Sequence, residues 1–195
     1  MEHLTLPDLT GITFKLSSGS ILRRCVPGDE QAVYEAVQRN IDHLYFMHWI
    51  TPDYSLQMAN EFIERSTRAS EAGESLGFGV FDGDRMIGSI GFTHFNEAAR
   101  RTEIGYWIDK DQEGKGLVSE ACKLLIDFAF NDLGINKIDI RCSAENLRSA
   151  AIPKKFGFKK EGLIRAAEVR QGKLHDFLWF GLLRSEWNAK VEPPV

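Results

Sequence analysis

The stretch of this chain best suited to chemistry is a glycine-flanked turn, Gly114-Lys115-Gly116, between a strand-like run at 102–108 and an amphipathic run at 116–133. A helix that begins at such a turn presents unpaired backbone N–H groups and a partial positive charge, which suit a phosphate or another anion. Glycine lacks a Cβ atom, so a ligand can approach those amides closely. The alternative is that the two glycines only allow a tight bend between strand and helix.

The turn matches neither of the two common phosphate-binding motifs. In a P-loop the lysine is followed by Ser or Thr, whereas Lys115 is followed by Gly116 and no glycine lies five residues before Gly114. A dinucleotide-binding fingerprint would need a third glycine at the position of Ser119. The turn alone therefore leaves the anion unidentified.

Length and composition indicate an ordinary globular protein with a single domain, residues 1–195. Hydrophobic residues make up 43% of the chain and charged residues 27%. The net charge of −4 argues against broad nucleic-acid binding, so local groups must hold any anionic ligand. The first residues lack the features of a secretory signal, and no apolar run is long enough to span a membrane. We therefore expect a cytoplasmic protein that binds neither nucleic acid nor a membrane.

Cysteines and histidines are too scattered for a disulfide framework or a metal site. The three cysteines form no CxxC pair, so we expect reduced thiols that pack as small hydrophobic groups. His43 and His48 are five residues apart, whereas a helical metal pair is four apart. We expect no metal.

Hydrophobic periodicity predicts a mixture of strands and helices. The longest helix is expected at 116–133, where Leu117, Ala121 and Leu125 share one stripe. The other predicted helices are 29–39, 55–72 and 146–155, and the predicted strands are 12–16, 20–25, 77–82, 86–95, 102–108, 136–142, 163–171 and 174–184. This order indicates an α/β fold in which helices are layered on a sheet.

Two segments carry a resemblance to a known family. The run TEIGYWIDKDQEGKGLVSEACKLLIDFAF resembles the acetyl-CoA motif of the GNAT N-acetyltransferases, Gln/Arg-x-x-Gly-x-Gly/Ala, with Glu113 and Val118 as departures when aligned on Gly116. The run AENLRSAAIPKKFGFKKEGLIR resembles the Asn-x-x-Ser segment of the ribosomal-protein N-terminal acetyltransferase (RimJ/RimL-type) branch, followed by its Gly-Phe and Glu-Gly pairs. The similarity is dense over 76–187 and looser over 20–75.

The resemblance implies a GNAT-like mixed sheet, mostly antiparallel and splayed at its middle, with helices on both faces. The core would cover 20–187, with a short tail at 188–195. Acetyl-CoA would enter where two strands part, with backbone groups of Trp107 and Ile108 on the pantetheine arm. The amides expected around the diphosphate are those of Gly114, Lys115, Gly116, Leu117, Val118 and Ser119. Asn146 would also contact the pantetheine, or would only cap its helix.

The family chemistry is acetyl transfer from the thioester to an amine. The branch implies that this amine is the N-terminal α-amine of a protein, and specifically of a ribosomal protein. An α-amino group has a pKa of about 7.7–8.0, against about 10.4 for lysine, so it loses its proton more readily. Glu168 matches the glutamate that receives this proton in the branch, and Glu103 matches the base of other GNAT enzymes. The choice between them stays open. Ser149 matches the residue that supports the departing sulfur, and Tyr106 is expected to be a core aromatic.

Other functions also remain open at this stage. The acceptor could be a small-molecule amine, or the chain could be a non-catalytic acyl-CoA-binding module, because Glu113 and Val118 depart from the motif. A nucleotide-dependent enzyme is the weakest alternative. The resemblance also admits a homodimer, and it places the aromatic-rich segment 41–50 at the wall of the acceptor groove. Arg148, Lys154 and Lys155 would either meet the 3′-phosphate of the cofactor or form a solvated basic face.

Overall fold

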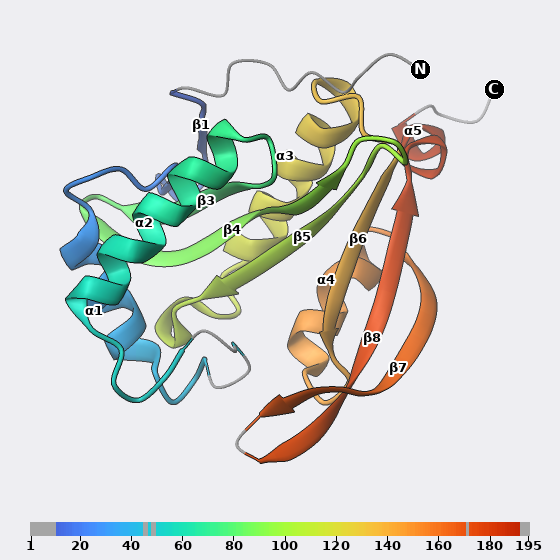
Figure 1. Cartoon of the computed structure of the whole chain (residues 1–195). Coiled ribbons are helices and arrows are strands. Elements are labelled where there is room, and N and C mark those ends of the chain that lie inside the picture. The colour runs from blue at the N-terminus through green and yellow to red at the C-terminus, as the bar shows by residue number, and fades with distance from the viewer. Residues whose placement is uncertain (1–10, 45–46, 48–49, 171, 192–195) are drawn as a thin grey trace.

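The computed structural model describes residues 11–44, 47, 50–170 and 172–191. Eight strands form one sheet, and five α-helices and one short 3₁₀ helix complete the described chain (Figure 1). The strands are β1 (Thr13–Lys15), β2 (Ile21–Arg23), β3 (Leu76–Asp82), β4 (Arg85–Asn96), β5 (Arg101–Ile108), β6 (Lys137–Ser143), β7 (Lys159–Arg170) and β8 (Lys173–Leu183). The helices are α1 (Glu30–Asn40), α2 (Leu56–Glu71), η1 (Lys110–Gln112), α3 (Leu117–Asn131), α4 (Leu147–Lys155) and α5 (Arg184–Val191).

The sheet is antiparallel except at one pair of strands near its centre. Its order is β1-β2-β3-β4-β5-β6-β8-β7, and only β5 and β6 run parallel. Their pairing covers Arg101–Glu103 of β5 and Lys137–Asp139 of β6, and then it stops. Figure 1 shows the two strands side by side where they begin and apart where they end. The sequence-based expectation of a mostly antiparallel sheet that splays at its middle is confirmed.

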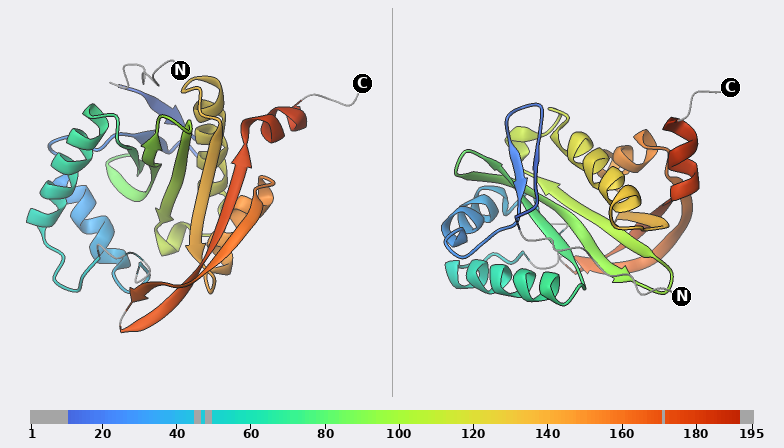
Figure 2. Two further views of the ribbon diagram at one scale, coloured as in Figure 1. Left: turned by 45° about the vertical axis from the view of Figure 1, so that its right-hand side comes forward. Right: turned by 90° about the horizontal axis from the view of Figure 1, so that it is seen from above.

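Helices pack on both faces of this sheet, as the view from above shows (Figure 2). On one face, α1 and α2 bury Val33, Val37 and Ile63 against Phe81, Met86 and Trp107. On the other face, α3 buries Leu117, Leu125 and Ile126 against the inward side chains of β3 to β6 and β8. We call these the α1 face and the α3 face.

Alternation along β5, β6 and β8 assigns each of their side chains to a face. Trp107 packs with the α1 and α2 cluster, so Glu103 and Gly105 also lie on the α1 face. Ile138, Ile140 and Cys142 belong to the α3-face core, so Asp139, Arg141 and Ser143 point the other way. The same reasoning places Leu178 and Phe180 of β8 on the α3 face, and His175, Phe177 and Trp179 on the α1 face.

The predicted elements agree with the structure except near the C-terminus. β7 begins at Lys159, four residues before the predicted start, and the last described helix, α5, was not predicted. β7 is an edge strand whose first residues are polar and exposed, so they carry no alternating pattern. None of the described helices is long and apolar enough to cross a membrane.

Candidate active site

The candidate site lies at the gap between β5 and β6. Beyond Glu103 the edge of β5 that faces β6 has no strand partner in the described structure, whereas its other edge stays paired with β4 as far as Ile108. Backbone N–H and C=O groups on an open edge must bond to something else. An extended ligand arm inserted there could bond to them, and Trp107 and Ile108 lie on that stretch.

The N-terminus of α3 lies next to the end of β5 and is open. Gly116 is its N-cap residue with φ 83°, and no side chain caps the helix. Gly114 also has a positive φ of 74°, and a Cβ atom at either glycine would meet no atom within 4 Å. Glu120, in the first turn, is bonded by the backbone and hydroxyl of Ser17 instead of capping the helix.

The amides of residues 114–119 therefore form a cradle of donors. In the described part of the chain none of them has a hydrogen-bond acceptor. Successive free N–H groups at a helix start, with the partial positive charge of the helix, suit a phosphate. The glycines thus leave room above the amides, as a ligand would require, and they also permit the bend.

A buried aspartate fixes the start of this loop. Asp109 is 2% exposed and accepts a hydrogen bond from the side chain of Asn40, the last residue of α1. Asn40 in turn accepts a hydrogen bond from the backbone N–H of Lys110 at 3.0 Å. Arg85 donates to the other Asp109 oxygen at 2.8 Å, and Arg39 lies 3.5 Å from it. α1 therefore holds in place the start of the loop that leads from β5 to the amide cradle.

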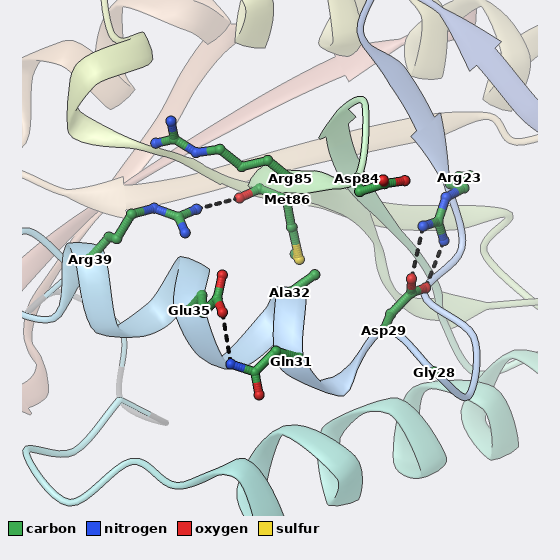
Figure 3. A pocket seen from close by; sticks show the side chains of 10 residues that line it. All are labelled: Arg23, Gly28, Asp29, Gln31, Ala32, Glu35, Arg39, Asp84, Arg85 and Met86. Carbon is green, nitrogen blue, oxygen red and sulfur yellow. Dashed lines mark hydrogen bonds and ion pairs between the residues drawn. The ribbon is translucent and has the colours of Figure 1, made fainter.

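A separate cavity of about 340 Å³ lies between α1 and the β3–β4 turn (Figure 3). Arg23 and Asp29 in its wall pair with each other, with oxygen–nitrogen distances of 2.6 and 2.8 Å. Figure 3 shows Arg39 pointing to the carbonyl of Met86, to which it donates at 2.7 Å. Because Arg23 and Asp29 satisfy each other, Arg39 bonds a backbone carbonyl and the free amides lie elsewhere, this cavity is the weaker candidate for an anionic ligand.

Glu113, one of the two departures from the acetyl-CoA motif, links three segments. It forms an ion pair with Arg148 at the start of α4, and its other oxygen lies 3.1 Å from Nε2 of His43. Arg148 is thus paired rather than simply solvated. A carboxylate beside the amide cradle opposes anion binding, but the Arg148 guanidinium offsets its charge. The pair also joins the cradle to α4.

Ser149 of α4 lies on the α3 face of the sheet, against Tyr106 of β5. Its backbone carbonyl accepts a hydrogen bond from the Tyr106 hydroxyl at 3.0 Å, and its own hydroxyl donates to the Tyr106 oxygen at 3.3 Å. Burial raises the pKa of Tyr106, so this phenol stays neutral. Burial also raises the pKa of the Cys142 thiol, and a hydrogen bond from Ser149 partly opposes that effect. Tyr106 packs against the core, as predicted, but its hydroxyl reaches Ser149.

Asn146 is the N-cap of α4. Its side-chain oxygen accepts a hydrogen bond from the Ser149 N–H at 3.0 Å. This cap holds the first turn of α4 in place, and with it the Ser149 hydroxyl. The capping role that the sequence suggested is present, and contact with pantetheine stays a prediction.

Glu103 lies on the α1 face, at the last position of β5 that pairs with β6. Burial raises the pKa of this carboxyl, and Arg141 of β6, 2.7 Å away, lowers it in part. Arg101, a basic residue nearer to Glu103 on the same strand, is not its partner. Arg101 bonds Asp139 instead. Arg141 lies 38 residues from Glu103 in sequence, so only the strand pairing could reveal it.

Glu168 lies on β7 just after a bulge in the β7–β8 pairing, where Ala166 has φ 50°. It forms an ion pair with Arg170 and is cross-strand partner to His175 of β8. Cross-strand partners share a face, so Glu168 lies on the α1 face with Glu103. The described structure brings Ser149 and Tyr106 together but gives each glutamate its own arginine. Neither Arg141 nor Arg170 was singled out from the sequence.

Two further expectations concern this region. Residues 45–46 and 48–49, which hold the aromatic side chains of the segment 41–50 expected along the acceptor groove, lie outside the described residues. In the part of the chain that the structure describes, no group of three or more histidine, cysteine or acidic side chains could hold a metal ion. Figure 1 shows no described helix in front of β8.

Comparison with known proteins finds related acetyltransferases. Residues 20–159 match the family described as acetyltransferase (GNAT) domain. The chain is 30% identical over 192 residues to YdaF of Bacillus subtilis (strain 168), named provisionally as a ribosomal N-acetyltransferase, covering 91% of this chain and 98% of YdaF. It is 25% identical over 157 residues to the ribosomal-protein-serine acetyltransferase of Escherichia coli (strain K12), covering 80% and 88%.

The fold is also similar to solved structures. RimL, the ribosomal L7/L12 α-N-protein acetyltransferase in complex with coenzyme A, superposes with a TM-score of 0.84 and 21% identity, covering 90% of this chain and 99% of RimL. At this identity the match concerns the fold alone. It agrees with the splayed sheet and the order of elements described above.

Proposed function

Because the chain belongs to the GNAT acetyltransferase family, we propose that it transfers the acetyl group of acetyl-CoA to the N-terminal α-amine of a protein, with a ribosomal protein as the acceptor. The observation that carries the cofactor assignment is the uncapped, glycine-lined start of α3 beside the gap between β5 and β6. The relatives named for ribosomal-protein acetylation support the acceptor. Work on ribosomal proteins would place the enzyme in the cytoplasm.

The described residues fit acetyl-CoA. The free amides of residues 114–119 would hold the diphosphate, and Lys115 could swing its ammonium from Gln112, 2.9 Å away, to a phosphate. The open edge of β5 at Trp107 and Ile108 would bond the pantetheine arm, with Asn146 beside it. The thioester would then lie in the gap, between the two faces of the sheet. When bound, it supplies an acyl carbon with a good leaving group.

The leaving thiol and the attacking amine would then lie on opposite faces of the sheet. The Ser149 hydroxyl, on the α3 face, would rotate from Tyr106 to donate to the departing sulfur. The amine would arrive from the α1 face, where its proton must go to a base. Its freed electron pair would attack the acyl carbon directly, and no covalent enzyme intermediate is needed. Backbone N–H groups of the open β5 edge would stabilise the oxyanion.

Two glutamates compete for the proton, and each has a distinct argument. Burial raises the pKa of Glu103, which improves a carboxylate as a base near neutral pH. Glu168 is more exposed than Glu103, but it forms an ion pair with Arg170. We keep both as candidate bases.

An acceptor screen tests the proposal. The protein is incubated with acetyl-CoA and peptides that begin with Ser, Ala, Thr or Met, and with free polyamines and aminoglycosides, and the products are read by mass. We expect acetylated α-amines on peptides with small first residues. Turnover confined to small amines would refute the protein acceptor, and a lack of turnover on every amine would refute transfer.

The same assay separates an enzyme from an idle acyl-CoA-binding module. In both cases coenzyme A should raise the melting temperature by mass action. Only an enzyme should lose turnover in the Glu103→Gln, Glu168→Gln or Ser149→Ala variant. If all three variants turn over at the rate of the parent chain, these residues take no part in acetyl transfer and the proposed site is wrong.

A further inference from the structure

A carboxylate-paired histidine lies on the α1 face beside Glu168, and the proposed mechanism has not used it. His175 of β8 is the cross-strand partner of Glu168. Its Nδ1 atom lies 3.3 Å from Oε2 of Glu145, in the loop between β6 and α4. The His175 side chain is only 12% exposed, whereas that of Glu145 is 71% exposed. Nδ1 is buried and makes no hydrogen bond of good geometry, so Glu145 is its one close charged partner among the described residues.

The hairpin that carries His175 is fixed to the start of α4. The backbone N–H of Ala144 donates to the carbonyl of Asp176 at 2.8 Å, and the Asp176 carboxylate accepts from the N–H of Ala166 at 2.8 Å. Glu145 directly precedes Asn146, which caps the turn that holds Ser149. His175 is therefore held against the same loop that positions the leaving-group side of the gap, but on the opposite face of the sheet.

The charges around His175 favour a role in proton transfer. Glu145 faces it from the β6–α4 loop, Glu168 and Arg170 face it from β7, and Lys173 and Asp176 flank it on β8. Arg170 pairs with Glu168, and Glu145 is the carboxylate that lies against Nδ1 of His175. With Nδ1 toward Glu145, the other ring nitrogen, Nε2, is left as the acceptor. Imidazole is the side chain that most readily gains and loses a proton near neutral pH.

We propose that His175, paired with Glu145, takes the proton from the acceptor α-ammonium in place of either candidate glutamate. This inference rests on the proposed function. One N–H bond of the ammonium breaks and its proton passes to Nε2 of His175, while the electron pair stays on the nitrogen for attack on the thioester. Glu145 lies against Nδ1 of the ring, and the Nε2 proton passes to solvent before the next turnover. Glu168, held by Arg170, then binds the incoming ammonium and acts as an anchor.

The test is the pH dependence of kcat/KM on a peptide that begins with serine, measured from pH 6 to 9.5 for the parent chain, His175→Gln and Glu145→Gln. Near pH 6.5 most of the amine is protonated, so we expect kcat/KM of His175→Gln to be about 10- to 100-fold lower than that of the parent chain. Near pH 9 the amine is already neutral, so kcat/KM of the variant should be within about threefold of the parent value. Glu145→Gln should show the same shape with a smaller deficit, and because Glu145 is exposed this variant tests the pair even if His175→Gln folds poorly.

His43→Gln is the matched control, since His43 is also paired with a glutamate, Glu113, but on the cofactor loop. It should alter the KM for acetyl-CoA and leave the shape of the pH profile intact. A deficit of His175→Gln that is equal at every pH would mean structural damage, and no deficit would mean no role; either result overturns the proposal. If the parent chain acetylates only small amines, the acceptor assignment fails while the same profile on that amine still tests His175. If it acetylates no amine, the proposal falls with the function.

Discussion

Replacing Gly116 by alanine separates the two roles of the glycine turn. Gly116 has φ 83° as the N-cap of α3, and a Cβ atom there would meet nothing within 4 Å in the protein. If the glycine only permits a bend, Gly116→Ala should cost stability alone. If the space above the amides holds a diphosphate, the added methyl group should also reduce cofactor affinity.

The two effects have different magnitudes. A left-handed residue other than glycine costs about 1–2 kcal/mol, and alanine recovers about 0.4–1 kcal/mol by restricting the unfolded chain. The net loss of about 1 kcal/mol should lower the melting temperature by about 2–4 °C in a chain of this size. Loss of one hydrogen bond to a charged phosphate costs about 1.5–3 kcal/mol, which corresponds to acetyl-CoA affinity about 10- to 100-fold weaker.

Gly134→Ala is the control, because Gly134 follows the other end of the same helix with φ 65°. Its nearest neighbour for an added Cβ is the Arg100 guanidinium at 3.8 Å, so it carries a similar backbone cost without a clash. Thermal melting and calorimetric titration with acetyl-CoA should show similar stability losses in both variants and an affinity loss in Gly116→Ala alone. Equal affinities in the two variants would refute the diphosphate assignment.

Three further substitutions test other contacts of the structure. Glu113→Gln should tighten acetyl-CoA binding about threefold at low salt, because charges about 8 Å apart in water interact by about 0.5 kcal/mol each, and the gain should fade at high salt in a titration series; weaker binding would show that the Arg148 pair is needed to shape the cradle. Arg23 lowers the pKa of Asp29, so this pair stabilises the fold above the ordinary carboxyl pKa of about 3.9, and its contribution is lost as the pH falls through the lowered value. Asp29→Asn should therefore cost about 1–2 kcal/mol in urea unfolding at pH 7 and nothing in strong acid, and a cost that is independent of pH would contradict the pairing. Ser149→Ala should lower kcat about tenfold in steady-state assays with little change in the KM for acetyl-CoA, whereas a change in KM alone would remove Ser149 from the chemistry.

The sequence predicted the elements whose hydrophobic pattern is strong. The stripe of α3 through Leu117, Ala121 and Leu125 is buried as expected. The pattern failed where burial is slight, at the polar start of β7 and in α5, whose only described side chain that is buried is Trp187. Such segments are ordered by the neighbours they meet in the fold, and periodicity cannot show this.

The site likewise contains local features that the sequence reveals and long-range contacts that it does not. A glycine turn at a helix start is a local feature, so residues 114–119 could be singled out from the sequence. The pairing of Glu103 with Arg141 depends on the register between β5 and β6, and that of His175 with Glu145 on how the β7–β8 hairpin meets the start of α4. These contacts join residues 30 or more positions apart, and no spacing rule connects them.

The position of the bound diphosphate can be measured directly by an NMR titration of backbone amides with coenzyme A. We predict saturable shifts of the amides of residues 114–119 at the start of α3, with those of Gly28 and Gln31 in the wall of the separate cavity unchanged. Shifts confined to that cavity, or no shift at 114–119 at saturating coenzyme A, would contradict this prediction.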